Sequence, residues 1–401
     1  MNTRSNQKGS TIGGVLLVSG TCIGAGMLAL PLVVSTAGFG AALLINALCW
    51  LFVLATGLLY LEVALWMEEG AHIISMARRF LGRFGEWFAG VIFLFLFYCL
   101  MTAYLAHGSP LLQTAIDPIL SLNSYFGFTL FCGFFFLVVL LGTSLIDHLN
   151  WILMSGLILS YLLMVGLGSS SVEAALLHAP GSWHAGWMAL PIFFSAYGYH
   201  NIIPSITSYL DRDVKKLRWA IIFGSSLPFI VYTLWLGLMM GSISQEELAT
   251  ANAAGIPVSA LLIESGAGLW LGRLSMFFSF FAITTSLLGV SLSMVDFLGD
   301  GLRIQQRTGW RRFFLTTLVF LPPALFAVDN PNAFQQALRL GGGLGEAFLN
   351  GLLPTLMVWV GRYQHLLHSK FRLPGGRVSL AMLFLFSIAV ILGELFTLWV
   401  G

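Results

Sequence analysis

The sequence predicts an all-α integral membrane protein with eleven transmembrane helices, arranged as a 5+5 inverted repeat followed by an eleventh helix. Three observations lead to this fold. Of the 401 residues, 58% are apolar and only 9% are charged, whereas roughly a quarter of an ordinary soluble domain is charged. Apolar runs of about 20 residues, long enough to span a bilayer as a helix, recur along the chain. Two of these runs are interrupted by glycine at matching positions in the two halves.

The apolar runs define the spans in order, at residues 11–36, 39–66, 84–107, 124–145, 149–168, 184–208, 217–241, 269–298, 313–328, 342–361 and 378–400. Residues 11–168 are expected to form the first five-helix repeat, residues 184–361 the second, and residues 378–400 the eleventh helix. The first run has no small-residue cleavage site and continues into a second span. We therefore interpret it as a transmembrane helix preceded by a cytoplasmic tail at residues 1–10, and not as a signal peptide.

The basic residues predict the orientation. With the amino terminus in the cytoplasm, 17 of the 19 Lys and Arg residues face inward, and the exceptions are Arg273 and Arg339. The carboxyl terminus is then expected outside. No hydrophilic stretch exceeds roughly 30 residues, which leaves no room for a soluble catalytic domain. The net charge is only +2 and the cations are spread over short loops, so no nucleic-acid partner is expected.

Both the first and the sixth spans are expected to be broken helices. Each has glycine at its middle and proline further on, in the segments Gly20-Thr21-Cys22-Ile23-Gly24-Ala25-Gly26-Met27-Leu28-Ala29-Leu30-Pro31 and Ser195-Ala196-Tyr197-Gly198-Tyr199-His200-Asn201-Ile202-Ile203-Pro204. Irregular backbone in lipid is tolerated only where it lines a cavity. Because each repeat has five helices, the second repeat runs in the opposite direction, as in many secondary transporters that bind substrate at paired breaks. Close helix packing is the alternative explanation for the glycines.

The backbone groups freed at the two breaks suit an amino acid. The second half of the first span begins with N–H groups at its positive dipole end, near Gly24, Ala25 and Gly26, and these suit a carboxylate. The first half-helices end in carbonyls that suit an ammonium group or a small cation, at Thr21, Cys22, Phe193, Phe194 and Ser195.

Aromatic residues crowd the second break and favour an aromatic substrate side chain. They are Phe193, Phe194, Tyr197 and Tyr199, with Tyr98 and Tyr104 on the third span. Packing of phenylalanine-rich helices explains such clusters equally well. His200 is the one ionisable residue within a break, which makes it a candidate for substrate or proton binding. Its alternative role is a hydrogen bond to a backbone carbonyl.

The eighth span carries hydroxyls in a row at Thr284-Thr285-Ser286, and hydroxyls combined with carbonyls from an unwound first helix suit Na⁺. Hydroxyls bonded to their own helix are the alternative. The intramembrane acids receive no role in transport. Glu346 is expected to pair with Arg339 at the outer end of the tenth span, and interfacial solvation is the interpretation for Glu62, Asp147, Asp296 and Glu394.

A short helix outside the membrane is expected after Ser244, because Ser244 and Glu247 have the spacing of a capping box. Two other classes of function fit less well. A channel would need rings of charge or repeated filter loops, and neither occurs. A membrane-embedded enzyme would need clustered His, Asp or Glu, and the eight histidines are scattered.

The sequence also resembles a known family, the bacterial tyrosine-specific and tryptophan permeases, which are hydroxy/aromatic amino acid permeases of the amino acid–polyamine–organocation superfamily. The segments that carry the resemblance are the glycine-rich motif at 20–31, Gly142-Thr143-Ser144-Leu145-Ile146-Asp147, Pro204-Ser205-Ile206 with Ser208-Tyr209-Leu210-Asp211, Lys216-Leu217-Arg218-Trp219 and Phe320-Leu321-Pro322-Pro323. The resemblance implies the leucine-transporter fold in a bacterial inner membrane. It also implies inward transport of an aromatic amino acid, tyrosine first, then tryptophan or phenylalanine, driven by an ion gradient that is usually of protons in these permeases, and no organic cofactor.

Carried over residue by residue, the resemblance places the substrate carboxylate on Gly24, Ala25 and Gly26, and the ammonium near Cys22, Phe193, Phe194 and Ser195. The sodium site of sodium-coupled relatives maps onto the carbonyls of Gly20, Ile23 and Ala282 and the hydroxyls of Thr285 and Ser286. Proton-coupled relatives often carry a helix-5 lysine at that site. This sequence has Leu157 in the region and no Lys or Arg in helix 5. The sequence therefore favours sodium over protons.

Overall fold

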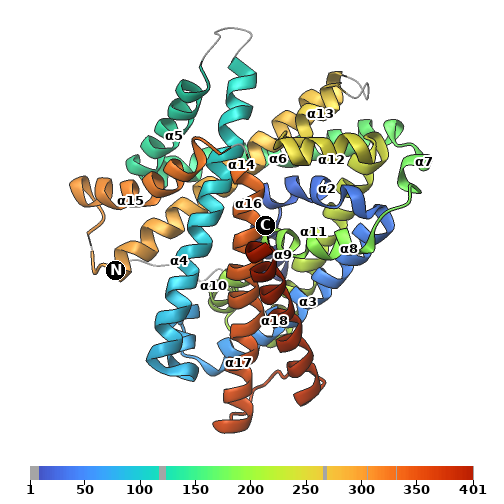
Figure 1. The fold of residues 1–401 in the computed structure, drawn as a ribbon. Helices are drawn as coiled ribbons and strands as arrows, with labels where there is room; N and C mark the ends of the chain where they lie inside the picture. The colour runs from blue at the N-terminus through green and yellow to red at the C-terminus, as the bar shows by residue number, and fades with distance from the viewer. Residues whose placement is uncertain (1–8, 117–122, 265–268, 305, 331, 401) are drawn as a thin grey trace.

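The regular structure consists of helices, and no strand occurs among the described residues (Figure 1). A computed structural model of the chain describes residues 9–116, 123–264, 269–304, 306–330 and 332–400. Within those ranges, eight helices are long and apolar enough to cross a membrane, or nine if the bent pair Thr11–Cys22 and Ala25–Val33 counts as one span. The protein is therefore an all-helical membrane protein with several spans, as its composition predicts.

The first half of the chain contains four long helices, of which glycine bends one and ends another. Gly82 lies inside α4 with φ +71°, so the span expected at 84–107 belongs to a longer, kinked element. Gly142 has φ +120° and ends α5, so the span expected at 124–145 stops at Leu141. The elements are α1 (Thr11–Cys22), η1 (Ala25–Ala29), α2 (Leu30–Val33), η2 (Ser35–Ala37), α3 (Phe39–Trp66), α4 (Ile73–Ile116), α5 (Ser124–Leu141) and α6 (Thr143–Gly168).

The second half begins with short elements and ends in longer ones. They are η3 (Ser169–Ser171), α7 (Ala174–Leu177), α8 (Trp183–Met188), α9 (Leu190–Ala196), η4 (His200–Ile202), α10 (Ile203–Tyr209), α11 (Val214–Ser242), α12 (Gln245–Ala254), α13 (Val258–Glu264), α14 (Leu269–Gly301), α15 (Gly309–Ala327), α16 (Ala333–Leu340), η5 (Gly341–Leu352), α17 (Leu353–Trp359), η6 (Val360–Gln364) and α18 (Gly376–Val400). The stretch from α16 through η6 is one continuous rod in which η5 and η6 are π-helical.

Two of the eleven expected spans are not among the eight or nine. Residues 184–208 fall on α8, α9, η4 and α10, of which none exceeds seven residues. Residues 313–328 fall in α15, whose 19 residues include Arg311 and Arg312 close to its start. Neither segment forms one long apolar helix: residues 184–208 are divided into short helices, and α15 is short and partly basic. The total of eleven stays a prediction.

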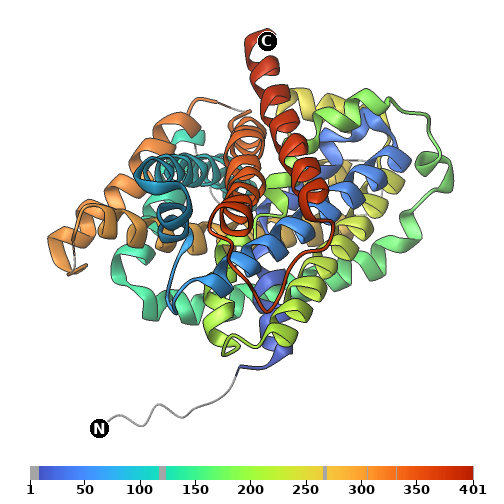
Figure 2. The same cartoon turned by 90° about the horizontal axis from the view of Figure 1, so that it is seen from below.

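The short helix expected after Ser244 is present as α12. The Ser244 hydroxyl accepts a hydrogen bond from the Glu247 backbone N–H, and the Glu247 carboxylate accepts one from the Ser244 backbone N–H at 3.0 Å. This capping box is confirmed. The helix packs against α2 and η2, which follow the first break. At the edge of the bundle, α18 packs on η5 and its carboxyl end projects past its neighbours (Figure 2).

Two acids expected at the membrane interface are buried in ion pairs instead. The Glu62 carboxylate accepts a hydrogen bond from Arg362 Nε at 2.7 Å, and both side chains are 1% exposed. The Glu394 carboxylate accepts one from Arg339 Nε at 2.9 Å and is 2% exposed. A carboxylate this deeply buried persists only with such a partner. The interfacial interpretation is wrong for both, because the partner arginine lies 300 or 55 residues away along the chain.

Asp296 and Asp147, the other two acids expected at the membrane interface, are not shown in buried ion pairs. The Asp296 side chain is 64% exposed and pairs with Arg307, so solvation and a surface ion pair account for it. The side chain of Asp147 lies outside the part of the chain that the structure describes.

Candidate functional site

The first break is held in place by side chains from two other helices. After α1 ends at Cys22, the chain runs extended through Gly24 before η1 begins, and the two halves bend by 46°. The Ala25 N–H donates a hydrogen bond to the Ser286 hydroxyl of α14 at 3.2 Å. From α11, Trp235 Nε1 donates one to the Met27 carbonyl at 2.9 Å. Neighbouring helices thus replace hydrogen bonds that the interrupted helix lacks.

The second break is anchored by its own side chains. Between the end of α9 at Ala196 and the start of α10 at Ile203, three aromatic or imidazole side chains reach α3. The Tyr197 hydroxyl donates to Asn46 Oδ1 at 2.7 Å, the Tyr199 hydroxyl donates to the Val53 carbonyl at 2.9 Å, and His200 Nε2 lies 2.9 Å from Thr56 Oγ1. All three break residues are 0% exposed.

The two breaks touch each other. A Cβ atom on Gly26 would lie 2.9 Å from the Ala196 Cα, so only glycine permits this approach of η1 to α9. The Tyr232 hydroxyl of α11 lies 2.7 Å from the carbonyl oxygens of both Cys22 and Ala196. A single phenol therefore serves the ends of both first half-helices, where a free ammonium or cation site was expected. Those two carbonyls are satisfied from within the protein.

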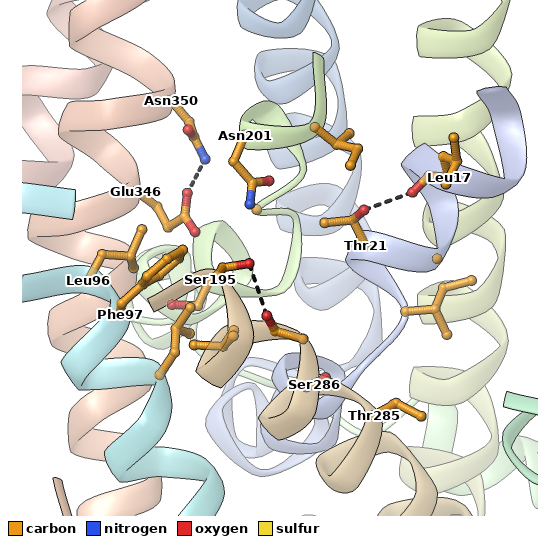
Figure 3. A pocket seen from close by; sticks show the side chains of 18 of the residues that line it. Leu17, Thr21, Leu96, Phe97, Ser195, Asn201, Thr285, Ser286, Glu346 and Asn350 are labelled. Carbon is orange, nitrogen blue, oxygen red and sulfur yellow. Dashed lines mark hydrogen bonds between the residues drawn. The ribbon is translucent and has the colours of Figure 1, made fainter. Parts of the chain in front are cut away.

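A cavity of about 450 Å³ lies beside the breaks (Figure 3). At one end its lining is exposed, with Leu16 60% and Leu17 43% accessible, and at the other it reaches Leu349 and Tyr104, 2% and 6% exposed. The cavity is thus open on the side where α1 begins. Its lining is drawn from α1, α4, α6, α9, α14 and η5 and from both breaks. It includes Gly20, Thr21, Ile23, Phe93, Phe97, Tyr104, Ser195, Gly198, Asn201, Thr285, Ser286, Gly289, Ser293, Glu346 and Asn350.

Comparison with known proteins identifies the family. The chain matches the Tryptophan/tyrosine permease family over residues 7–394. It belongs to this family. The tyrosine-specific transport systems 1 and 2 of Haemophilus influenzae are 31% and 32% identical, over 96% and 98% of this chain and 95% and 98% of their own lengths. The tryptophan-specific transport protein of the same organism is 29% identical over 96% of both chains. The protein is therefore a transporter and not an enzyme.

Six of the residues predicted for binding line the cavity of this transporter. They are Gly20, Thr21, Ile23, Ser195, Thr285 and Ser286. Most of their hydroxyls bond nearby carbonyls: Thr21 donates to the Leu17 carbonyl at 2.7 Å, and Thr285 to the Phe281 carbonyl at 2.8 Å. Ser286 differs, because its oxygen faces the first break. A Cβ on Gly24 would lie 2.3 Å from Ser286 Oγ.

The remaining predicted residues do not line the cavity, contrary to expectation. They are Cys22, Gly24, Ala25, Gly26, Tyr98, Phe193, Phe194, Tyr197, Tyr199, His200 and Ala282. The aromatic members point elsewhere for identifiable reasons. Tyr98, for example, donates to the Leu318 carbonyl at 3.0 Å, a carbonyl that faces Pro322 one turn later and so has no helical N–H partner. The aromatic residues that do line the cavity come from α4, namely Phe93, Phe97 and Tyr104.

The sequence analysis missed Glu346. Its side chain lies in the cavity and accepts a hydrogen bond from Asn350 Nδ2 (Figure 3). A Cβ on Gly198 would lie 2.3 Å from Glu346 Oε1, so the carboxyl group occupies the space that glycine leaves at the second break. The expected pair with Arg339 is wrong, because that arginine binds Glu394.

A signal for Glu346 was present in the sequence. Gly341-Gly342-Gly343 ends three residues before it within an apolar run. A Cβ on Gly342 would lie 1.6 Å from the Pro191 carbonyl oxygen, so η5 and α9 approach each other very closely. Glycines that permit close approach, followed by an intramembrane acid, indicate a functional site by the same rule that was applied only to His200.

Proposed function

We propose that the protein imports an aromatic amino acid across the bacterial cytoplasmic membrane by alternating access, driven by an inward gradient of Na⁺ or H⁺. Tyrosine is the first expected substrate, followed by tryptophan and phenylalanine. The observation that carries the proposal is the cavity of about 450 Å³ at two touching helix breaks. A cavity of this size suits a ligand of amino-acid dimensions. The names of the relatives, tyrosine- and tryptophan-specific transport proteins, support the substrate class.

Reciprocal packing supports a 5+5 inverted repeat with the leucine-transporter fold. In the proposed scheme, α4 and α6 are the third and fifth helices of the first repeat. The third and fifth helices of the second repeat are α14 and the α16–η5–α17 rod. The fifth helix of each repeat packs against the third helix of the other, as α6 on α14 and η5 on α4. Likewise α1 packs on α11, and α9 and α10 pack on α3. A pseudo-two-fold axis produces such paired contacts.

A second cavity supports alternating access. It has a volume of about 330 Å³ and is lined by residues from α2, α8, α9, α12 and α16, including Val33, Ile192, Asn252 and Arg339. Val33 directly follows the first break and Ile192 precedes the second, so this lining lies on the side of the breaks away from the start of α1. With the amino terminus in the cytoplasm, the larger cavity opens inward. The structure then corresponds to an inward-facing state.

At the site itself, we assign the substrate carboxylate to the backbone N–H groups of residues 24–26, which rocking of α14 away from η1 exposes by releasing Ala25 from Ser286. The aromatic side chain occupies the cavity next to Phe93 and Phe97. The candidate sodium ligands are the carbonyls of residues 20, 23 and 282 with the hydroxyls of Thr285 and Ser286.

Uptake of radiolabelled tyrosine, tryptophan, phenylalanine and leucine into proteoliposomes tests the proposal. We expect the three aromatic amino acids to accumulate under an imposed cation gradient, and unlabelled aromatic substrate inside the vesicles to accelerate entry of label. Such exchange distinguishes a carrier from a channel. Leucine uptake equal to that of tyrosine would instead indicate a transporter of another amino acid class.

A further inference from the structure

Glu346 is the only Asp, Glu, Lys, Arg or His among the described residues that line the main cavity. It is 4% exposed, and Figure 3 shows its carboxyl group and Asn350 extending from η5 toward the second break, with Asn201 and Ser195 nearby. Two other buried acids in the part of the chain that the structure describes, Glu62 and Glu394, each have an arginine partner. Among the described residues, the cavity thus contains one carboxyl group without an ion-pair partner.

The groups around Glu346 are neutral or already paired. The elements packed against η5 are α3, α4, α9, α16, α17 and α18. From α3 and α4, the titratable groups near the acid are phenols and a thiol, and the arginine of α16 binds Glu394. The surrounding titratable and charged side chains are Cys22, Tyr60, Cys99, Tyr104, His200, Arg339 and Glu394.

The chemistry of this position suits a proton better than a metal ion. Asn350 presents its amide nitrogen to the carboxylate, and an N–H donor repels a cation where an oxygen would bind one. Sodium needs about five or six oxygen ligands, by analogy with other hard cations, whereas a proton needs a single carboxylate oxygen. Tyr60, the nearest phenol of α3, donates its hydrogen to the Leu349 carbonyl at 2.6 Å and so offers no free ligand in this state.

We propose that Glu346 is the proton-binding residue that couples transport to a proton gradient. This inference rests on the proposed function and specifies its coupling ion. One proton binds one carboxylate oxygen of Glu346 while the cavity faces outward, travels with the amino acid, and leaves when the cavity faces inward. No other bond forms or breaks.

Because its carboxyl group lies against Gly198, a change in the charge of Glu346 affects the backbone of the second break. As a carboxylate, the group only accepts hydrogen bonds; as a carboxylic acid, it also donates one. Because the carboxyl group fills the space beside Gly198, this change acts directly on the irregular backbone between α9 and α10. Protonation thereby favours closure of the cavity around the bound amino acid, since closure no longer buries an unpaired charge.

Proton entry and amino acid uptake measured together in proteoliposomes test the inference. Vesicles contain the full-length protein and a pH-sensitive dye, and receive tyrosine, tryptophan or leucine in sodium-free buffer. We expect the wild type to acidify the lumen when its substrate is added. Glu346→Gln should abolish both acidification and accumulation driven by a pH gradient, yet retain exchange of labelled for unlabelled substrate, because exchange moves no net proton.

Glu394→Gln is the matched control, since it removes another buried carboxylate of the same bundle that lies outside the cavity. It should retain substrate-dependent acidification. Asn350→Ala provides a second variant that keeps the acid but removes its amide donor. Without that donor the carboxylate form is less stabilised and the group stays protonated at higher pH, so uptake should extend to more alkaline pH.

Three outcomes would overturn the inference: acidification that persists in Glu346→Gln, aromatic uptake in the wild type without any proton entry, or loss of exchange in a correctly folded Glu346→Gln. The last would make Glu346 a ligand of the substrate ammonium. Failure of the proposed function is distinguishable, because proton entry with leucine but not with tyrosine or tryptophan would refute the substrate class while leaving the role of Glu346 intact. Gel filtration and thermal denaturation establish that each variant is folded.

Discussion

The two helix breaks face the same cavity, yet they are stabilised in opposite ways. Residues 24–26 of the first break have no polar side chains, so α11 and α14 supply the phenol, indole and hydroxyl groups that hydrogen-bond its backbone. The second break supplies its own polar groups, and Tyr197, Tyr199 and His200 extend away from the cavity to α3. The first break depends on its neighbours, whereas the second is anchored by its own side chains to α3 and shares the Tyr232 hydroxyl with the first.

The difference shows which part of each break is available to a ligand. At the first break Ile23 lines the cavity, and the small residues at 24–26 behind it let Ser286 and Ala196 lie directly against the backbone. At the second break the large side chains are committed to α3, so the cavity receives only Ser195, Gly198 and Asn201, with Glu346 in the space beside the glycine. We therefore expect substitutions at the first break to affect substrate binding, and most substitutions at the second to affect stability.

Gly26→Val should have the largest effect. A Cβ at this position would lie 2.9 Å from the Ala196 Cα, so a branched side chain separates the two breaks. Overpacking of this kind costs about 1–3 kcal/mol in stability, and we expect uptake to fall to the level of protein-free liposomes. The measurement is labelled aromatic amino acid uptake alongside thermal denaturation of the purified protein.

Gly133→Val is the control for that experiment, because a Cβ on Gly133 of α5 would meet no atom within 4 Å. It should retain uptake. Gly26→Ala is a milder variant that keeps the protein folded while still crowding Ala196, and it should lower uptake partially. Normal uptake by Gly26→Val would show that close contact between the breaks is dispensable.

Tyr232→Phe should have the next largest effect. The change removes the hydroxyl at 2.7 Å from the Cys22 and Ala196 carbonyls and leaves both in an apolar environment. A buried polar group without a partner costs about 1–3 kcal/mol, so the melting temperature should fall and uptake with it. Tyr197→Phe removes a hydroxyl that serves only Asn46 and should lower the melting temperature without lowering the affinity for substrate. Equal loss of substrate affinity in both variants would contradict the distinction between the breaks.

The position of both breaks could be predicted from sequence, but the direction of the side chains could not. Glycine at mid-helix followed by proline identifies a discontinuity from local chemistry alone. Whether Tyr199 points to the cavity or to α3 depends on Gly57, where a Cβ would lie 2.2 Å from the Tyr199 hydroxyl oxygen. That complementarity links positions more than 140 residues apart, and no local pattern reveals it.

Partners of buried charges were unpredictable for a related reason. The spacing of Arg339 and Glu346 on one rod suggested a pair, yet the π-helical turns of η5 change the angular relation of residues along it. Glu394, on α18, is the true partner of Arg339. Composition and periodicity therefore predicted a polytopic helical fold, whereas the acid at the site required the packing of distant helices.

Phe97→Ala compared with Phe194→Ala is a selectivity test of smaller expected size. Phe97 lines the cavity, whereas Phe194 stacks on Phe52 with ring centroids 4.9 Å apart and does not line it. An aromatic pair contributes about 0.5–1.5 kcal/mol beyond its buried area, so Phe97→Ala should weaken competition by tyrosine about two- to tenfold relative to leucine. Phe194→Ala should leave that ratio unchanged. A change of the ratio in Phe194→Ala but not in Phe97→Ala would instead show that the second break determines substrate selectivity.

Ser286→Ala and Thr285→Ala should have the smallest effects, and they separate the two candidate coupling ions. The Ser286 oxygen accepts the Ala25 N–H, so its loss should cost about 0.5–1.5 kcal/mol, while Thr285 bonds carbonyls of its own helix and should matter less. If Glu346 carries the coupling proton, the double variant retains partial, sodium-independent uptake that still follows an imposed pH gradient. Wild-type uptake that requires sodium and disappears in the double variant would establish a cation site at the first break, and would leave Glu346 without a coupling role.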